Sequence, residues 1–283
     1  MLSMRTNVAS LSAQTALNRA AVSQSTAATR LSTGYRVNSA MDDAAGLQIA
    51  TRLAAQSSGM TMAMRNIQNG ISLMQVADSV AGSLVDIFSR MHDLAIQAAD
   101  GSSTKADKEA LQEEFGAMFD QAWEVVSTTY NGEYLFVDTG AASSDKFMRP
   151  LNFQIGDSRS DVMTANFRDP LIQTLPSFKY GDTDLLDILT AHASEAIEDM
   201  SSAIDAWASF RSATGAVANA LAHASNNLGN MLTNTQAATG RIMDADYATE
   251  SANATSSQML MQASTSMLKQ SSSASQLTLS LIS

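Results

Sequence analysis

The placement of proline constrains the fold of this chain more than any other feature of its sequence. The three prolines, Pro150, Pro170 and Pro176, all lie in one middle stretch of the 283 residues. Proline is the strongest local breaker of a helix, so residues 1–149 and 177–283 are both open to long, uninterrupted helices. The sequence therefore predicts helical segments on either side of a short middle stretch.

Apolar residues in both segments recur at the spacing of a helical seam. One stripe runs between about residues 42 and 99, and at about 1.5 Å per residue a helix of this length would reach roughly 80 Å. A second stripe runs from Leu111 to Thr129, and the most regular one runs from Phe210 to Ile242 in alternating steps of four and three. Stripes this long are typical of coiled-coil or antiparallel seams. We expect a mainly α fold, a long antiparallel helical-bundle rod with coiled-coil-like seams.

Capping residues mark the expected starts of two of these helices. Ser39 followed by Asp42 and Asp43 gives a side-chain cap and first-turn acids that suit the helix dipole. Thr104 with Asp107 three residues later resembles a capping box.

The middle stretch has the composition of short strands and turns. An Asn-Gly pair, which is a strong turn signal, ends the second stripe within residues 130–133. Residues 134–137 and 151–155 are rich in β-forming side chains, and loops bounded by proline continue to about residue 182. The sequence predicts a small central insert over residues 138–182 that contains a β-hairpin.

The two ends of the chain differ from the rest in charge. Every acidic residue lies between Asp42 and Glu250. The apolar residues of the ends form no single stripe, which suits helices surrounded by several partners. Neither end alone could bury enough apolar surface to offset the entropy of ordering it. We therefore expect the terminal helices to pair with each other or with neighbouring copies of the chain. The residues predicted to carry this core assembly are Leu11, Leu17, Leu31, Met259, Met267, Leu268 and Leu279.

The overall composition disfavours several classes of partner. The net charge of −11 disfavours nucleic acid, whose binding depends on basic residues that neutralise phosphates. The chain has no cysteine, which excludes disulfides and thiolate metal sites, and its three histidines are too few for most transition-metal centres. No run of 18 apolar residues occurs, so we expect no membrane insertion. The N-terminus also lacks the apolar region of a secretory signal.

Motifs that would indicate an enzyme are missing from the sequence. It contains no H-E-x-x-H, G-x-S-x-G, P-loop or G-x-G-x-x-G. Glu113 and Glu114 are adjacent and would diverge on a helix, and Asp157 and Asp161 lack the spacing of a calcium loop. We expect no catalytic residue, no cofactor and no metal site, and hence no enzyme.

Four blocks of sequence occur in an order that matches a known family. They are RLSTGYRVNSA and DDAAG within residues 30–46, IQNGIS over 67–72, RMHDLAIQ over 90–97 and RIMDADYATE over 241–250. Together these blocks resemble those of bacterial flagellin, the subunit of the flagellar filament. The resemblance covers about residues 1–137 and 200–283, so the chain looks like a short flagellin with a reduced central variable region.

The resemblance implies a domain organisation and a function. Residues 1–42 and 244–283 would form the two halves of the inner-core domain D0, as paired terminal helices. Residues 43–137 and 183–243 would form the rod domain D1, and residues 138–182 would be the short central insert. The function implied is that of a structural subunit that polymerises into the extracellular filament used for swimming.

The resemblance also implies partners. They are further copies of this chain and other flagellins, the filament cap and hook–filament junction proteins, a flagellin export chaperone, and the flagellar export apparatus, which needs no cleaved signal peptide. Host Toll-like receptor 5 reads the rod helices of this family, and Arg90, Leu94 and Glu114 match its contact residues. Leu94 also lies on the seam, so core packing is an equal alternative for this residue.

Two other functions remain open from the sequence. A hook–filament junction protein has the same two helical ends, although the block over residues 241–250 and the one over 90–97 favour flagellin. A coiled-coil adaptor that is not exported would have similar seams, and finding the chain in sheared extracellular filaments would exclude that role.

Overall fold

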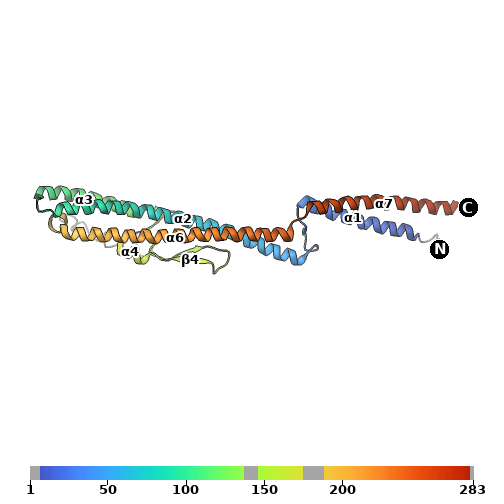
Figure 1. The fold of residues 1–283 in the computed structure, drawn as a ribbon, viewed down its shortest axis with the longest axis horizontal. Coiled ribbons are helices and arrows are strands. Elements are labelled where there is room, and N and C mark those ends of the chain that lie inside the picture. Colours follow the sequence, from blue (N-terminus) through green and yellow to red (C-terminus); the bar gives the residue numbers. More distant parts are fainter. Residues whose placement is uncertain (1–6, 137–145, 175–187, 281–283) are drawn as a thin grey trace. The chain divides into compact units, whose positions relative to one another are not determined.

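The computed structural model describes residues 7–136, 146–174 and 188–280, and it confirms a mainly α fold (Figure 1). The helices are α1 (Val8–Thr33), α2 (Ala44–Ala99), α3 (Lys105–Val126), α4 (Arg168–Thr174), α5 (Ile188–Ala191), α6 (Ala193–Met243) and α7 (Tyr247–Ser280). The strands are β1 (Thr129–Tyr130), β2 (Glu133–Tyr134), β3 (Leu151–Gln154) and β4 (Val162–Ala165).

The chain divides into two compact units. The terminal unit contains residues 1–57 and 233–283, and the middle unit contains residues 58–232. The helices α2 and α6 are long enough to supply residues to both units. The kind of side chain that packs inside differs between the two units.

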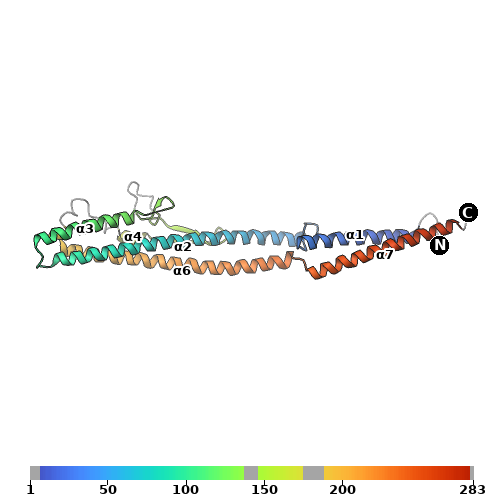
Figure 2. The same cartoon turned by 90° about the horizontal axis from the view of Figure 1, so that it is seen from above.

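Three helices, α2, α3 and α6, share the apolar core of the middle unit. In two views α2 and α6 run side by side (Figures 1 and 2), and they are antiparallel because Asp78 pairs with Arg211 while Gly70 lies beside Leu221. The predicted seam positions of α2 are buried from Met60 to Ala98, and each large apolar side chain buried in this way contributes about 1.5–3 kcal/mol to folding. The seam prediction is confirmed for most positions of this part of the helix.

The seam of α6 is confirmed over most of its predicted length. Phe210, Leu221 and Leu228 are buried, and Thr214 is buried with its hydroxyl donating to the Arg211 carbonyl at 2.8 Å. Met231, also predicted on the seam, is 43% exposed. The apolar packing of the middle unit therefore thins out toward Met231.

The described ranges contain two hairpins, as antiparallel pairs of short strands. In the β1–β2 hairpin, Asn131 and Gly132 both have positive φ, 55° and 81°, as the predicted Asn-Gly turn requires. Strand β2 covers Glu133–Tyr134, so Tyr134 is the one described residue of the strand predicted over residues 134–137 that is paired. Residue 137 lies outside the described part. The hairpin predicted in the central insert is confirmed as β3–β4, with Leu151 opposite Ala165.

Helix α4 lies within the insert, where the prolines predict loops. Pro170 is the third residue of α4. A backbone N–H in the first turn has no partner inside the helix, so proline is tolerated there. The position of the proline within the element decides its effect.

The capping predictions were correct at one helix and wrong at the other. Thr104 and Asp107 form both bonds of the capping box at α3. At α2, however, Asp43 caps the helix, since its carboxylate accepts from the Gly46 amide at 2.8 Å. Asp42 instead accepts from the amides of Asn38 and Ser39, which closes the preceding turn. The cap was misplaced because three candidate side chains stand within five residues.

Helix α2 contains a long apolar stretch that is interrupted by a few polar residues. Within the described part of the chain, α2 is the one helix with an 18-residue window, of mean hydropathy 1.3, long and apolar enough to cross a membrane. That window is 39% buried inside the protein. A core helix of a soluble protein passes the same test, and α2 supplies core residues from Met60 onward. The finding is therefore weak evidence for a membrane span.

Two glycines of α2 allow the insert to approach closely. A Cβ atom at Gly70 would stand 2.9 Å from the Phe153 ring of β3 and 3.1 Å from Leu221 of α6. A Cβ atom at Gly59 would stand 2.7 Å from Cβ of Asp157, in the loop between β3 and β4. The hairpin thus packs against α2 where the helix has no side chain.

We expect Gly70→Ala to destabilise the middle unit by about 1–3 kcal/mol, because the methyl group would push into Phe153 and Leu221. The matched control is Gly215→Ala on α6, where nothing lies within 4 Å of the new Cβ. That change should instead stabilise the helix by about 0.5–1 kcal/mol. Urea unfolding followed by circular dichroism measures both free energies, and equal effects of the two changes would contradict this close packing.

Candidate assembly and recognition surfaces

The terminal unit pairs α1 with α7 through small side chains. The buried residues of α1 are Ala13, Ala20 and Ala27, which are seven residues apart. On α7, Ser257 and Ser264 are buried at the same spacing. The Ser257 hydroxyl lies 3.1 Å from the Ser23 hydroxyl, and the Asn7 amide donates to the Ser271 carbonyl at 3.4 Å. The helices are therefore antiparallel and in close contact, but this seam buries little apolar surface.

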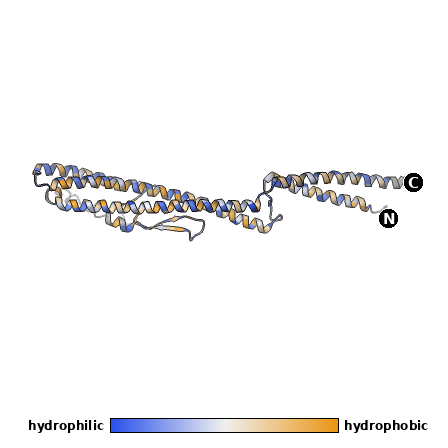
Figure 3. Cartoon of the chain, in the orientation of Figure 1, coloured by the Kyte–Doolittle hydropathy of each residue, from blue (hydrophilic) through white to orange (hydrophobic). Residues whose placement is uncertain are grey.

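Large apolar side chains of the same two helices point away from the seam. Figure 3 shows hydrophobic positions scattered along both helices. Among the exposed ones are Val8 (72%), Leu11 (58%), Val22 (67%), Met259 (59%), Leu260 (56%) and Met267 (63%). This arrangement is the reverse of an ordinary core, in which large apolar side chains are inside and small polar ones are outside.

The predicted core-assembly residues fall into three groups. Leu11, Met259 and Met267 are exposed, while Leu17, Leu31 and Leu268 are half-buried. The side chain of Leu279 lies outside the described residues. Since a single chain leaves the six described side chains fully or partly exposed, they are available for contacts with other molecules.

A short strand-like contact joins the segments that follow α1 and precede α7. The Gly34 carbonyl accepts from the Ala245 amide at 2.9 Å, and the Arg36 amide donates to the Met243 carbonyl at 2.6 Å. Gly34 ends α1 with a φ of 77°, a left-handed conformation that residues with a side chain rarely adopt. This turn places the start of α7 beside the end of α1.

An ion pair between half-buried Arg30 and buried Glu250 links the described parts of α1 and α7. Arg30 Nη1 lies 2.8 Å from Glu250 Oε1, and Glu250 is only 7% exposed. Arg30 Nε is buried and has no hydrogen-bond partner within the described residues. Both residues lie in blocks that carry the family resemblance, but sequence reasoning did not pair them. The two residues are 220 positions apart in the chain, so no local sequence pattern indicates that they form a pair.

Asp246 caps the start of α7. Its carboxylate accepts from the Thr249 hydroxyl at 2.8 Å and from the Ala248 amide at 2.9 Å. These hydrogen bonds, with that of the Thr249 hydroxyl the largest, lower the pKa of Asp246. The lowered pKa keeps the cap ionised, which favours the positive end of the helix dipole.

The residues matched to receptor contact lie in the middle unit at different depths. Arg90 of α2 and Glu114 of α3 form an exposed ion pair, with 2.8 Å between Nη2 and Oε1. Leu94, one turn after Arg90, is only 1% exposed and belongs to the core. Another molecule can therefore reach Arg90 and Glu114 directly, whereas Leu94 supports the position of α2 from beneath.

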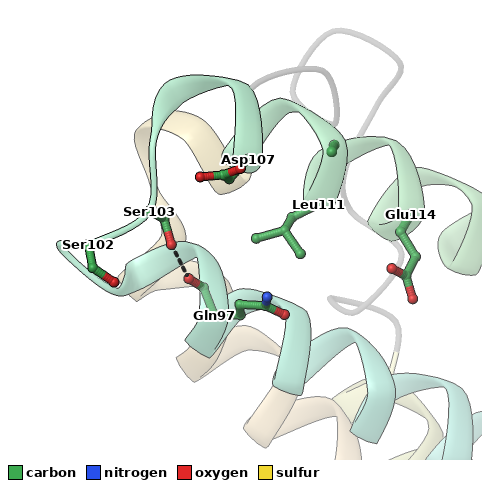
Figure 4. A pocket seen from close by; sticks show the side chains of 7 residues that line it. Gln97, Ser102, Ser103, Asp107, Leu111 and Glu114 are labelled. Carbon is green, nitrogen blue, oxygen red and sulfur yellow. Dashed lines mark hydrogen bonds between the residues drawn. The ribbon is translucent and has the colours of Figure 1, made fainter.

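An open recess of about 380 Å³ lies beside this ion pair, at the connection between α2 and α3 (Figure 4). Gln97, Asp107, Leu111 and Glu114 line it, and the Ser103 hydroxyl donates to the Gln97 carbonyl at 2.9 Å. Across the described ranges, no three His, Asp or Glu side chains converge to hold a metal ion. The recess is a polar surface feature and has no catalytic arrangement.

Comparison with known proteins assigns the family. The model of the bacterial flagellin N-terminal helical region matches residues 4–141, and that of the C-terminal helical region matches residues 197–282. The chain is 31% identical to polar flagellin A of Vibrio parahaemolyticus and 30% identical to flagellin D of Vibrio anguillarum, in each case over 99% of both chains. The alignment with polar flagellin A has 373 positions against the 283 residues of this chain, so the relative is longer.

A solved structure of a putative flagellar hook-associated protein from Vibrio parahaemolyticus is also similar. It has a TM-score of 0.55 and 13% sequence identity, and the match covers 72% of this chain and 100% of the other. At this identity the likeness shows a shared fold alone. Because both helical regions match and full-length relatives are about 30% identical, this chain belongs to the bacterial flagellin family.

Proposed function

We propose that this flagellin is a structural subunit that polymerises into the extracellular flagellar filament, and that its terminal unit makes the innermost contacts. Members of this family are structural proteins, so the protein is not an enzyme. The observation that carries the proposal is the reversed packing of α1 and α7, with alanine and serine inside and large apolar side chains outside.

The energetic reason is that exposed apolar surface favours association. Each of these side chains contributes about 25 cal/mol per Å² of surface that neighbouring copies remove from water. A head-to-tail contact between copies that does not close into a ring forms an open helical filament. Each added copy then buries the same apolar surface again. The terminal unit has the surface that such a polymer requires.

Sedimentation of purified monomer tests this function. Monomer seeded with short fragments should form sedimentable filaments above a critical concentration, and the same chain should be found in filaments sheared from cells. A chain that stays in the soluble fraction in both experiments would exclude the filament role and would favour the non-exported adaptor.

The domain organisation is proposed in the same terms. Residues 1–42 and 244–283, which contain α1 and α7, form the inner-core domain D0. Residues 43–137 and 183–243 form the rod domain D1, and residues 138–182 form the reduced central insert. The terminal compact unit also includes the start of α2 and the end of α6.

The remaining partners are proposed from the family. They are the filament cap, the hook–filament junction proteins, a flagellin export chaperone that covers the exposed side chains of α7, and the export apparatus, which moves the chain without a cleaved signal peptide. The junction-protein alternative has only fold-level support, whereas flagellin relatives match along the full length. Copy number per flagellum separates the two roles.

We also propose that host Toll-like receptor 5 recognises the surface around Arg90 and Glu114. Soluble monomer should activate the receptor, and Arg90→Ala should weaken activation about tenfold or more, since it removes a charged contact. Leu94→Ala should act indirectly, by destabilising the core by about 2–5 kcal/mol. A cell reporter of receptor activation, read against monomer concentration, measures these effects.

The matched control is Arg211→Ala. Arg211 pairs with Asp78 of α2 at 2.9 Å with similar exposure, but it lies on α6. Its replacement should leave activation unchanged. A wild-type monomer that gives no signal, or equal losses for both arginines, would remove this recognition claim.

A further inference from the structure

The methionine residues of the described part range from fully buried to exposed, and the exposed ones include Met41 (97%) before α2 as well as two on α7. Met60, Met74, Met91 and Met200 are at most 1% exposed, inside the middle unit. By contrast, Met259 and Met267 are 59% and 63% exposed on α7. Methionine sulfur is open to oxidants where the side chain is accessible, so the two groups differ sharply in reactivity.

Met259 and Met267 lie on the surface that the proposed function uses for assembly. They lie near Leu260, which is 56% exposed, on α7, the helix that packs against α1 through a seam of small side chains. A flexible thioether suits such a surface, because it adapts to the shape of a neighbouring chain. The same side chain is the one apolar type that a mild oxidant makes polar.

We propose that Met259 and Met267 are sites of reversible oxidation by peroxide, and that their sulfoxide forms exclude the monomer from the filament. In this reaction the thioether sulfur loses two electrons and forms a bond to one peroxide oxygen. The O–O bond breaks, and the second oxygen leaves as water. The proposal rests on the assembly role of the terminal unit described above.

The physical effect follows from burial. A sulfoxide oxygen accepts hydrogen bonds, and an apolar contact with a neighbouring chain offers no donor in return. Burying such a group without a partner opposes association. Methionine already buried in a filament is shielded, so oxidation acts on the monomer before it assembles.

Partition of partly oxidised wild-type chain tests the proposal. Monomer treated with hydrogen peroxide to partial conversion is polymerised and sedimented, and peptide mass spectrometry gives the sulfoxide fraction at each methionine in both fractions. Sulfoxides at Met259 and Met267 should be enriched about tenfold in the unassembled fraction, as expected for one unpaired polar group per contact. Those at Met62 and Met231, 51% and 43% exposed in the middle unit, should distribute evenly.

Repair and substitution sharpen the result. Treatment of the unassembled fraction with the two methionine sulfoxide reductases should restore assembly. After peroxide treatment, the Met259→Leu plus Met267→Leu variant should give the same polymer yield as the untreated variant. The Met62→Leu plus Met231→Leu variant should lose polymer yield after treatment, as the wild type does. Even partition of all four sulfoxides, or protection by the second pair of substitutions, would overturn the proposal. Failure of unoxidised wild-type chain to sediment would instead refute the proposed function.

Discussion

A chain that ends at Glu250 is expected to keep its folded middle unit and to lose polymerisation completely. The deletion of residues 251–283 removes most of α7, including the exposed Met259, Leu260 and Met267. None of the core residues of the middle unit lies in this segment. The expected result is a soluble monomer with cooperative thermal unfolding and no sedimentable material in a seeded assembly assay.

Point substitutions separate the loss of contacts from the loss of the helix. Leu11→Ser plus Leu260→Ser keeps α1 and α7 at full length and leaves the buried alanines and serines of their seam unchanged. This variant should also raise the critical concentration for assembly, by about tenfold or more, because it removes apolar surface that neighbours would cover. Normal filaments from the truncated chain would show that residues 251–283 are not needed for the assembly surface.

Phe210→Ala is expected to destabilise the middle unit more than any other substitution considered above, by about 3–5 kcal/mol. Phe210 of α6 is fully buried at the centre of an aromatic cluster. Its ring centroid lies 5.3–5.9 Å from those of four other rings, and these are Phe136, Phe147, Phe167 and Trp207. The change leaves a cavity where the insert meets α6, and the melting temperature should fall by about 10 °C or more.

Ile96→Ala provides the control for this substitution. Ile96 is 49% exposed on α2, and alanine is the better helix former. Its effect should stay within about 0.5 kcal/mol. Differential scanning calorimetry measures both variants, and a cost at Phe210 no greater than that at Ile96 would mean that the aromatic cluster does not hold the insert to α6.

Sequence reasoning succeeded for features that depend on a periodic pattern or on residues close together in the chain. The stripe from Met60 to Ala98 is buried as predicted, because periodic apolar residues on a long helix leave a single face for packing. Thr104 and Asp107 were recognisable as a capping box since both bonds lie within four residues. The Asn131-Gly132 turn is equally local, and it has the positive φ values that its residues allow.

Contacts distant along the chain could not be predicted from the sequence. Arg30 and Glu250 are recognisable as a pair only after α1 and α7 are placed side by side. The seam of α1 escaped notice because alanine at a spacing of seven looks the same as alanine on a surface. Leu94 had two possible roles, and only the three-dimensional arrangement shows that its side chain is inside the subunit.

The seam between α1 and α7 has a consequence for the axial alignment of the two helices. Alanines that recur every seven residues, facing serines of the same spacing, would fit almost as well after a slide of one heptad. Alanine and serine side chains are too short to interlock with the facing helix and so do not prevent that slide. The Arg30–Glu250 ion pair opposes it, since a shift would separate the two charges and leave the buried Glu250 without a counterion. This ion pair, together with the backbone hydrogen bonds of Gly34 and Arg36, thus sets the register of the terminal helices, as a buried polar residue does in a coiled coil.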